Sequence, residues 1–241
     1  MVSREPLLLI VASSRMELEP IAGQLSKRSR ARLDLEWSRV GLLGGRPVVL
    51  AASGAGRANA ARAVERAAGQ YLLRALVSTG WCGGLDPALR PGQVVVADRV
   101  LSLDPPAEFP ACWPKGAPAG GIGRGIVLTV DRFVQSAQGK RELRLTGALA
   151  VEMEAAGVAA EAKKRNLPFY CIRAVSDDVT ASFAIDYNRA LLDDGRFSKA
   201  RVVAQAGLSP ARWKELLLFW RRARQAARAL GAFFGSVQFE G

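Results

Sequence analysis

Histidine is absent from the 241-residue sequence. This absence excludes catalytic triads of serine, histidine and aspartate, cysteine–histidine pairs and the zinc-binding HExxH helix. Cysteine is scarce, and Cys82, Cys112 and Cys171 are too widely spaced to form the C-x-x-C pair of a zinc or iron–sulfur site. Acid–base chemistry must therefore rest on carboxylates, lysine, tyrosine or water, and we expect neither a metal nor a cofactor.

Long hydrophobic runs are also absent. The longest uncharged stretches, residues 75–85 and 229–239, are eleven residues long, whereas a membrane-spanning helix needs roughly 17–25 apolar residues. The start of the chain lacks the small-residue cleavage site of a secretory signal. With 49% hydrophobic and 23% charged residues, the composition is that of an ordinary globular protein. We therefore expect a cytoplasmic protein, at most peripheral to the inner face of a membrane.

Acidic residues are few relative to basic ones, and the formal net charge is +12. Residues 196–241 hold nine Lys and Arg side chains against two Glu, so most of the excess lies in the last part of the chain. Such a charge attracts nucleic acid, anionic lipid or a phosphorylated substrate. No nucleic-acid-binding motif accompanies it, so we expect no specific nucleic acid partner.

Short apolar runs alternate with segments of helical periodicity, which predicts an α/β fold. We expect a single domain with a central, mostly parallel mixed sheet flanked by helices over residues 1–195. A basic helical extension over residues 196–241, with an amphipathic helix, is expected to pack on it. Residues 104–125, rich in proline and glycine, predict a loop that could act as a lid. Strands are expected at 7–12, 75–79, 93–100, 126–130, 149–153 and 169–175, a hairpin about residues 44–45, and helices at 16–27, 59–73 and 154–165.

Two glycine-containing segments follow strands, where ligands bind in such sheets. Residues 53–59 open a helix, so their backbone N–H groups could hold an anion. Residues 79–84 carry glycines dense enough to let the backbone approach a ligand closely. In both cases a tight turn without a ligand is the alternative.

Three carboxylates stand out in apolar surroundings. Glu152 and Glu154 are two residues apart, so in a strand they would face the same side. A buried carboxylate without a partner is unfavourable and usually serves to bind hydroxyls, metals or protons; an ion pair with Arg173 is the alternative. Asp177 ends the strand at 169–175, where a partly desolvated carboxylic acid could donate a proton to a leaving group. A helix cap near Thr180 is the alternative there.

Three motifs resemble the purine nucleoside phosphorylase and 5′-methylthioadenosine/S-adenosylhomocysteine nucleosidase superfamily. Residues 79–85 (TGWCGGL) are similar to its Thr-Gly-x-x-Gly-Gly-Leu segment. Residues 151–156 (VEMEAA) and 173–177 (RAVSD) are similar to its Val-Glu-Met-Glu-Ala and Arg-x-Ile-Ser-Asp signatures. Within the superfamily, residues 85–92 (LDPALRPG) and the basic tail resemble the hopanoid-associated phosphorylases, and futalosine hydrolase is a near relative.

This resemblance implies cleavage of the N-glycosidic bond of a purine nucleoside, a 5′-substituted adenosine such as adenosylhopane, with release of adenine. Futalosine or methylthioadenosine/S-adenosylhomocysteine hydrolysis is the alternative. Asp177 would assist departure of the base, and Glu154 with Met153 would hold the ribose. Phe133 would stack on the base, and the Val134 backbone would bind its edge. The other base-binding positions implied are Gly83, Cys82 and Ser176.

The resemblance leaves the attacking group open. Glu19 aligns with the glutamate that activates water in the nucleosidases; a solvent-facing acid in the first helical turn is the alternative. Phosphorylases carry Arg and Ser where this chain has Ser78 and Trp81, so phosphate is either a co-substrate bound differently or not used. The pocket for phosphate or water would be formed by Ser53, Gly54, Arg57, Gly80 and Trp81.

The tail predicts an amphipathic helix with aromatic residues and arginines. Packing of this helix on the sheet is one interpretation, and contact with anionic lipid is the other. The resemblance also implies a homo-oligomer, a dimer or larger. A nucleic-acid-binding protein and a nucleoside-binding protein without catalysis are the non-enzyme alternatives. The residues of the apolar stripe are Trp213, Leu216, Leu217, Trp220, Ala223, Ala227, Leu230 and Phe234.

Overall fold

Six consecutive apolar residues form strand β1 (Leu7–Ala12) at the centre of the sheet, and all of them are buried. The computed structural model describes residues 5–118 and 120–240. The prediction that the chain has no secretory signal rests in part on the first four residues. These residues lie outside the described part of the chain. The remaining strands are β2 (Ser26–Arg30), β3 (Trp37–Leu43), β4 (Arg46–Ala52), β5 (Leu73–Gly84), β6 (Val94–Leu103), β7 (Pro106–Pro110), β8 (Gly123–Thr129), β9 (Ala150–Glu152) and β10 (Phe169–Asp177).

The sheet is mixed, as expected. Its order is β10-β6-β8-β9-β5-β1-β4-β3-β2, and β7 pairs with β6. Parallel pairing joins β4, β1, β5 and β10 at the centre, whereas β3 and β2 add antiparallel strands at one side. Since β10 pairs with β6 as well as with β5, the strands β5, β10, β6, β8 and β9 form a closed ring. The candidate residues Gly83 and Asp177 lie at the carboxyl ends of β5 and β10, where this ring meets the open sheet.

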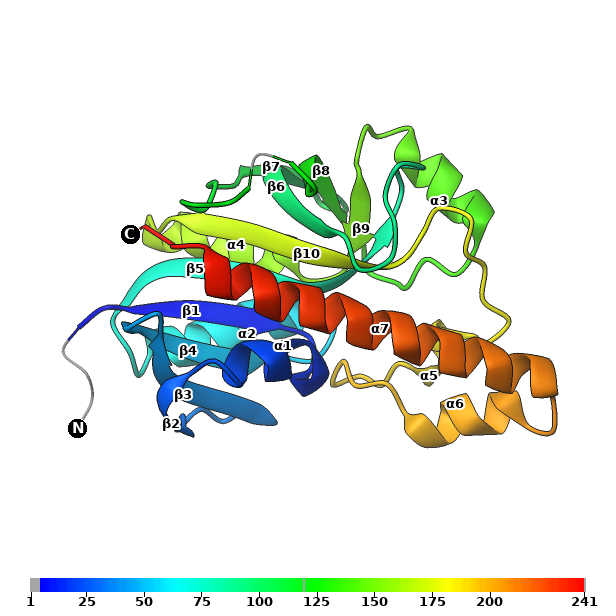
Figure 1. Ribbon diagram of the computed structural model, residues 1–241, viewed down its shortest axis with the longest axis horizontal. Helices are drawn as coiled ribbons and strands as arrows, with labels where there is room; N and C mark the ends of the chain where they lie inside the picture. Colours follow the sequence, from blue (N-terminus) through cyan, green and yellow to red (C-terminus); the bar gives the residue numbers. More distant parts are fainter. Residues whose placement is uncertain (1–4, 119, 241) are drawn as a thin grey trace.

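Helices cover both faces of the sheet (Figure 1). One face packs on α2 (Arg57–Ala68) and α4 (Ala155–Arg165), with Leu7, Leu9 and Val11 of β1 in that core. The other face packs on α1 (Arg15–Ala22) and α7 (Pro210–Ser236), with the intervening Leu8 and Ile10. This alternation is what a strand buried on both sides requires. Helix α3 (Ala137–Arg144) lies beside the strand ring, and α5 (Tyr187–Ala190) and α6 (Lys199–Ala206) precede α7.

Four predicted segments differ from the structure. The helix expected at 59–73 ends at Ala68, and β5 begins at Leu73. The helix expected at 16–27 ends at Ala22, and the exposed, cationic β2 follows it because its backbone pairs with β3. The loop expected at 104–125 contains β7, which forms an antiparallel pair with β6, and the start of β8, so the prediction of an irregular lid is wrong. The glycines at 79–84 continue β5 instead of following it. The hairpin about residues 44–45 is confirmed by antiparallel β3 and β4.

Helix α7 changes character along its length. Its second half is buried against α1 and the sheet, with Ala226, Leu230 and Phe234 in the core. Its first half extends beyond the sheet beside α6 (Figure 1) and leaves Trp213, Leu217 and other apolar side chains exposed. The division of the chain at residue 195 stays a prediction. Among the described helices, none has a stretch long and apolar enough to cross a membrane.

Candidate active site

Arg173 brings the carboxylates of the VEMEAA motif together. It lies on β10, is fully buried, and forms ion pairs with Glu152 and with Glu154, the latter at 3.3 Å between Nη1 and Oε2. Its guanidinium also donates to Ser78 Oγ at 2.6 Å and to the carbonyl oxygen of Thr79 at 2.9 Å. The two glutamates therefore do share one buried site, but the ion pair with Arg173 also forms, so neither lacks a partner.

One guanidinium serves two carboxylates here, and Glu154 is the less fully compensated. Burial raises the pKa of Glu154 to about 8, against the opposing attraction of Arg173. The neighbouring negative charge of Glu152 acts in the same direction as burial. The backbone N–H of Gly56 donates to Glu154 Oε1 at 3.1 Å. Glu154 thus contacts the start of α2. Its raised pKa allows it to gain or lose a proton near neutral pH.

A third glutamate, Glu17 of α1, joins this group. It is 3% exposed and accepts hydrogen bonds from the backbone N–H of Trp81 at 2.8 Å and from Ser13 Oγ at 2.6 Å. Gly80 makes the approach of Glu17 feasible. With φ of +134°, a Cβ there would lie 2.5 Å from Glu17 Oε1 and 3.0 Å from Arg173 Nη1. The glycine predicted to allow close approach of a ligand therefore admits the Glu17 carboxylate.

Glu19 does not reach this group. Its side chain is 51% exposed and pairs with Arg15, one helical turn earlier, at 2.7 Å. Residues 17 and 19 are two positions apart on a helix, so they point in different directions and only one can face the sheet. The prediction that placed Glu19 at the site is corrected: Glu17 occupies that place, and Glu19 matches the alternative of a solvent-facing acid.

Asp177 ends β10 in a second buried group. Its Oδ1 accepts a hydrogen bond from Ser176 Oγ at 2.5 Å, and its Oδ2 forms an ion pair with Lys140 of α3. Lys140 is fully buried, and its Nζ also donates to the carbonyl oxygen of Asp178 at 2.6 Å. Gly83 lies against this pair, since a Cβ there would be 3.3 Å from Asp177 Oδ2. The structure thus brings Asp177, Ser176 and Gly83 together, as predicted, and adds Lys140.

Phe133 lies in an aromatic group near Asp177. Its ring contacts those of Phe183 and Tyr187, with centroids 5.4 and 5.0 Å apart, and that of Phe219 on α7. The Asn188 side chain accepts from the Phe133 backbone N–H and donates to its carbonyl oxygen. The loop after β8 is therefore tied to the segment after β10 and to the C-terminal helix.

The other predicted base- and ribose-binding residues surround these groups. Met153 and Cys82 are buried, and Ser176 Oγ, whose one proton is donated to Asp177, lies 3.2 Å from the carbonyl oxygen of Cys82. Burial raises the pKa of the Cys82 thiol, so that cysteine stays protonated. Val134 packs its side chain in a small core with Val151. Trp81 contributes its backbone N–H, while its ring packs against the core beneath α1 and α7.

Several donors of the predicted anion-binding segment have partners within the protein. Ser53 Oγ donates to the carbonyl oxygens of Ala12 and Gly54, and the Gly54 N–H donates to the carbonyl oxygen of Ser13. The Gly56 N–H at the start of α2 binds Glu154. One N–H group at this helix start is therefore bound by a carboxyl group of the protein itself.

Arg57 is likewise paired. Its guanidinium binds both carboxylate oxygens of Asp131, at 2.8 and 2.6 Å, and Ser102 Oγ at 2.9 Å. A bidentate carboxylate partner compensates the charge that a phosphate would need. In residues 5–118 and 120–240, the Asp, Glu and Cys side chains form no group of three or more that could hold a metal ion.

Two residues of the site were missed from the sequence. Glu17 had a usable signal, since Ser14 and Glu17 form a capping box at the start of α1. Lys140 had none, because α3 is short and its other residues are not buried. Only the packing of α3 against the end of β10 identifies that lysine.

Comparison with known proteins agrees with the motif resemblance. A 5′-methylthioadenosine/S-adenosylhomocysteine nucleosidase of Mycobacterium bovis is 29% identical, over 80% of this chain and 94% of that protein. The Neisseria meningitidis nucleosidase, solved with methylthio-immucillin-A, has the same fold, with a TM-score of 0.70 at 24% identity over 96% of this chain and 100% of that one. The sequence pattern of the phosphorylase superfamily matches residues 6–113 and 121–204. Because that match runs through most of the chain, the protein is an enzyme of the phosphorylase superfamily.

Proposed function

We propose that this enzyme hydrolyses the N-glycosidic bond of a 5′-substituted adenosine and releases adenine. The observation that carries the proposal is two buried groups that contain acidic residues: Glu17 and Glu154 around Arg173, and Asp177 with Lys140 at the end of β10. The names of the related nucleosidases support the same bond and the same base. Among the alternatives open from sequence, a methylthioadenosine/S-adenosylhomocysteine hydrolase fits these relatives best.

The roles follow from the charges that develop during cleavage. As the bond to the base breaks, the ribose gains oxocarbenium character, which a buried carboxylate stabilises. Glu154 is placed to bind the ribose hydroxyls and that charge, with Met153 beside it. Asp177 faces N7 of the purine, and Phe133 stacks on the base. Glu17, in place of Glu19, accepts a proton from the attacking water.

The charge of the site favours water over phosphate. Glu17, Glu152 and Glu154 surround the single guanidinium of Arg173, and Asp131 pairs with Arg57. A phosphate dianion entering here would meet more negative than positive charge, which opposes its binding. We infer that water attacks the anomeric carbon and that phosphate is not a co-substrate.

The test is base release from 5′-methylthioadenosine, S-adenosylhomocysteine, adenosine and inosine, followed by chromatography with and without phosphate. Adenine release independent of phosphate is expected from at least one 5′-substituted adenosine. Asp177→Asn should bind that substrate and turn it over at least about 10²-fold more slowly. Asp178→Asn is the matched control, since the Asp178 carboxylate binds Thr180 instead of Lys140. A requirement for phosphate would refute hydrolysis, and undiminished turnover by Asp177→Asn would remove it from the mechanism.

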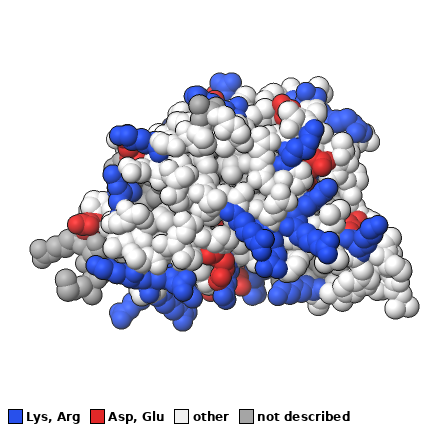
Figure 2. All heavy atoms as spheres, in the orientation of Figure 1, with Lys and Arg blue, Asp and Glu red and all other residues white. Residues whose placement is uncertain are grey.

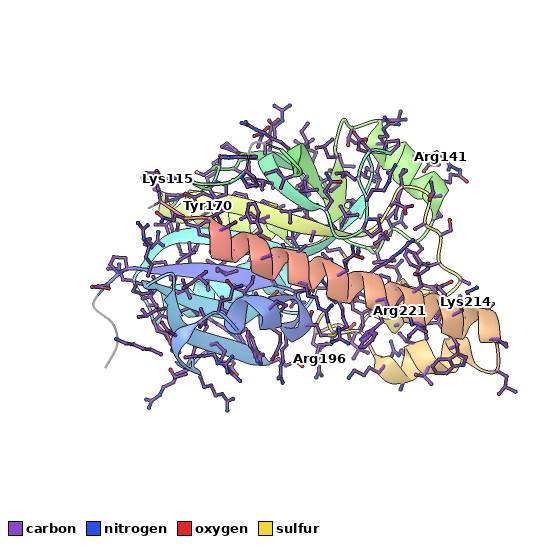
Figure 3. The ribbon with its side chains drawn as sticks, in the orientation of Figure 1. Lys115, Arg141, Tyr170, Arg196, Lys214 and Arg221 are labelled. Atoms are coloured by element: carbon purple, nitrogen blue, oxygen red, sulfur yellow. The ribbon has the colours of Figure 1, made fainter. Side chains whose placement is uncertain are left out.

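We also propose that the exposed half of α7 contacts anionic lipid, which would suit a lipid-linked 5′ substituent such as a hopane. Trp213, Leu217 and Trp220 lie at helical spacing on one side of α7, each close to half exposed. Basic side chains, among them Lys214 and Arg221, project from the same part of the helix (Figure 3). Apolar and cationic groups side by side are typical of peripheral lipid contact. Assembly into a homo-oligomer stays a prediction.

A further inference from the structure

The positively charged ammonium group of Lys140 is buried where few polar groups contact it. Lys140 is the buried residue of α3, and its Nζ contacts the Asp177 carboxylate and the Asp178 carbonyl oxygen. The Phe183 ring lies on another side, 5.9 Å from Nζ to the ring centroid. Burying an ammonium ion is strongly unfavourable without an ionic partner. Asp177 is that partner, and the absence of a side chain at Gly83 leaves room for the pair.

The ion pair with Lys140 makes Asp177 a carboxylate before the substrate binds. Its Oδ1 accepts a hydrogen bond from Ser176 and its Oδ2 accepts one from Lys140. A carboxyl group that accepts at both oxygens beside an ammonium ion is a carboxylate. A carboxylate has no proton to give to N7, although departing adenine needs one. Of the two groups that donate a hydrogen bond to Asp177, the Lys140 ammonium is the more acidic.

We propose that Lys140 supplies the proton that Asp177 delivers to the purine, so that Lys140 is a positioning residue acting through Asp177. This inference rests on the proposed N-glycosidic hydrolysis. One N–H bond of the Lys140 ammonium breaks as Asp177 takes its proton and an N7–H bond forms. The electron pair of the glycosidic bond passes to the base, which leaves as neutral adenine. Lys140 is left as an amine, and Glu17 holds the proton lost by the attacking water.

A cavity beside the Lys140–Asp177 pair provides a route by which a proton can return to Lys140. The cavity has a volume of about 240 Å³ and touches Asp177, Asp178, Glu215 and Arg222, among other residues between the segment after β10 and α7. Water in such a cavity could return a proton to Lys140 after each turnover, because Asp177 forms part of its wall. The ionisable groups that line this cavity together with Asp177 are Asp178, Glu215 and Arg222, and those of Tyr187 and Cys82 interact with Asp177 electrostatically.

The test compares Lys140→Met and Lys140→Arg on two substrates. The first is the adenosine derivative cleaved by the wild type, and the second is p-nitrophenyl β-D-ribofuranoside, whose phenolate leaves without a proton. For Lys140→Met we expect kcat to fall about 10²-fold or more on the adenosine derivative and to change only a few-fold on the phenyl riboside. Lys140→Arg should be as slow as Lys140→Met, because a guanidinium keeps its proton.

Arg141→Met is the matched control, since Arg141 is exposed on the same helix (Figure 3) and its loss changes the charge equally. Its kcat should stay at the wild-type value on both substrates. Equal losses of Lys140→Met on both substrates, or recovery of kcat by Lys140→Arg, would show that the lysine only holds the fold or Asp177. An undiminished kcat of Lys140→Met on the adenosine derivative would show that Asp177 carries its own proton. Each of these results would overturn the proposal. Thermal unfolding of each variant shows whether it is folded. Absence of base release by the wild type would instead refute the proposed function itself.

Discussion

Arg173 is one positive charge in a space shared by Glu17, Glu152 and Glu154. Glu152 is more fully bonded than Glu154, since the N–H groups of Glu154 and Ala155 donate to it in addition to the ion pair. Glu154 is left with less compensation and a raised pKa. Such a carboxyl group responds strongly to any new positive charge, which is what an oxocarbenium ion provides. The network therefore prepares Glu154 for its proposed role.

This raised pKa predicts a pH dependence of stability. The pKa of Glu154 rises from 4.5 to about 8 in the folded protein, so between these values the folded state holds a proton that the unfolded chain has released. Stability from this group is present in full below pH 4.5 and is lost as pH rises through about 8. Glu154→Gln, which cannot ionise, should lack this part of the decline.

The measurement is the free energy of unfolding in urea across that pH window for the wild type, Glu154→Gln and the exposed control Glu19→Gln. The control should follow the wild-type curve. A Glu154→Gln curve parallel to the wild type would show that Glu154 ionises normally in the folded protein.

Gly80 gives a second prediction at the scale of one residue. In Gly80→Ala the new methyl group would lie 2.5 Å from Glu17 Oε1, so Glu17 or the strand must move. Gly45→Ala is the control, because Gly45 also has a positive φ, of +81°, but has nothing within 4 Å of the added Cβ. Both variants carry about 1–2 kcal/mol of backbone strain.

Gly80→Ala should lose about 1–3 kcal/mol more than Gly45→Ala through overpacking. It should also lose nucleosidase activity, while Gly45→Ala keeps it. Urea unfolding and adenine release measure the two effects. Equal behaviour of the two variants would mean that Glu17 does not need its place beside Gly80.

At the scale of elements, the two halves of α7 differ in burial. Replacing leucine by alanine should therefore change the free energy of unfolding strongly in one half and weakly in the other. Leu230, in the second half of α7, is fully buried, whereas Leu217, in the first half, is 48% exposed. Leu230→Ala should reduce the free energy of unfolding by about 2–5 kcal/mol. Leu217→Ala should change it by about 0.5 kcal/mol or less. Chemical denaturation of both variants measures these changes. Equal losses of unfolding free energy would mean that the first half of α7 is also packed.

The predictions for single elements succeeded or failed for identifiable reasons. Strand β1 was predicted because all its residues are buried and apolar, and β10 because its buried residues are mostly apolar on both sides of Arg173. Strand β2 was missed because all its side chains are exposed and only backbone pairing with β3 forms it. Strand β7 was missed because prolines at both its ends indicated a loop, although only its pairing edge must face β6.

At the scale of the whole molecule, basic side chains cover more of the face that carries α7 than acidic ones do (Figure 2). We predict binding to vesicles with anionic lipid that weakens as salt screens the charges. Deletion of residues 207–241 cannot test this, because it would remove Leu230, Phe234 and other core residues. The double variant Trp213→Ser and Trp220→Ser changes only half-exposed side chains.

Flotation with anionic and with neutral vesicles measures this binding. The wild type should float with anionic vesicles at low salt, and the double variant should float less. The variant Leu72→Ser is the control, since Leu72 is exposed far from α7 along the chain. Recovery of the wild type wholly in the soluble fraction with both vesicle types would exclude the lipid contact.

The sequence by itself determined the α/β class, the central strands and the superfamily, because these depend on continuous apolar runs and on three local motifs. It also identified Glu154, Asp177, Ser176 and Gly83, which lie within those motifs. Tertiary structure alone decided which glutamate of α1 faces the site, because the direction of a helix face depends on what the helix packs against. It also brought Lys140 to Asp177 across 37 residues and divided α7 into a buried and an exposed half. Such contacts join distant segments, and no local pattern records them.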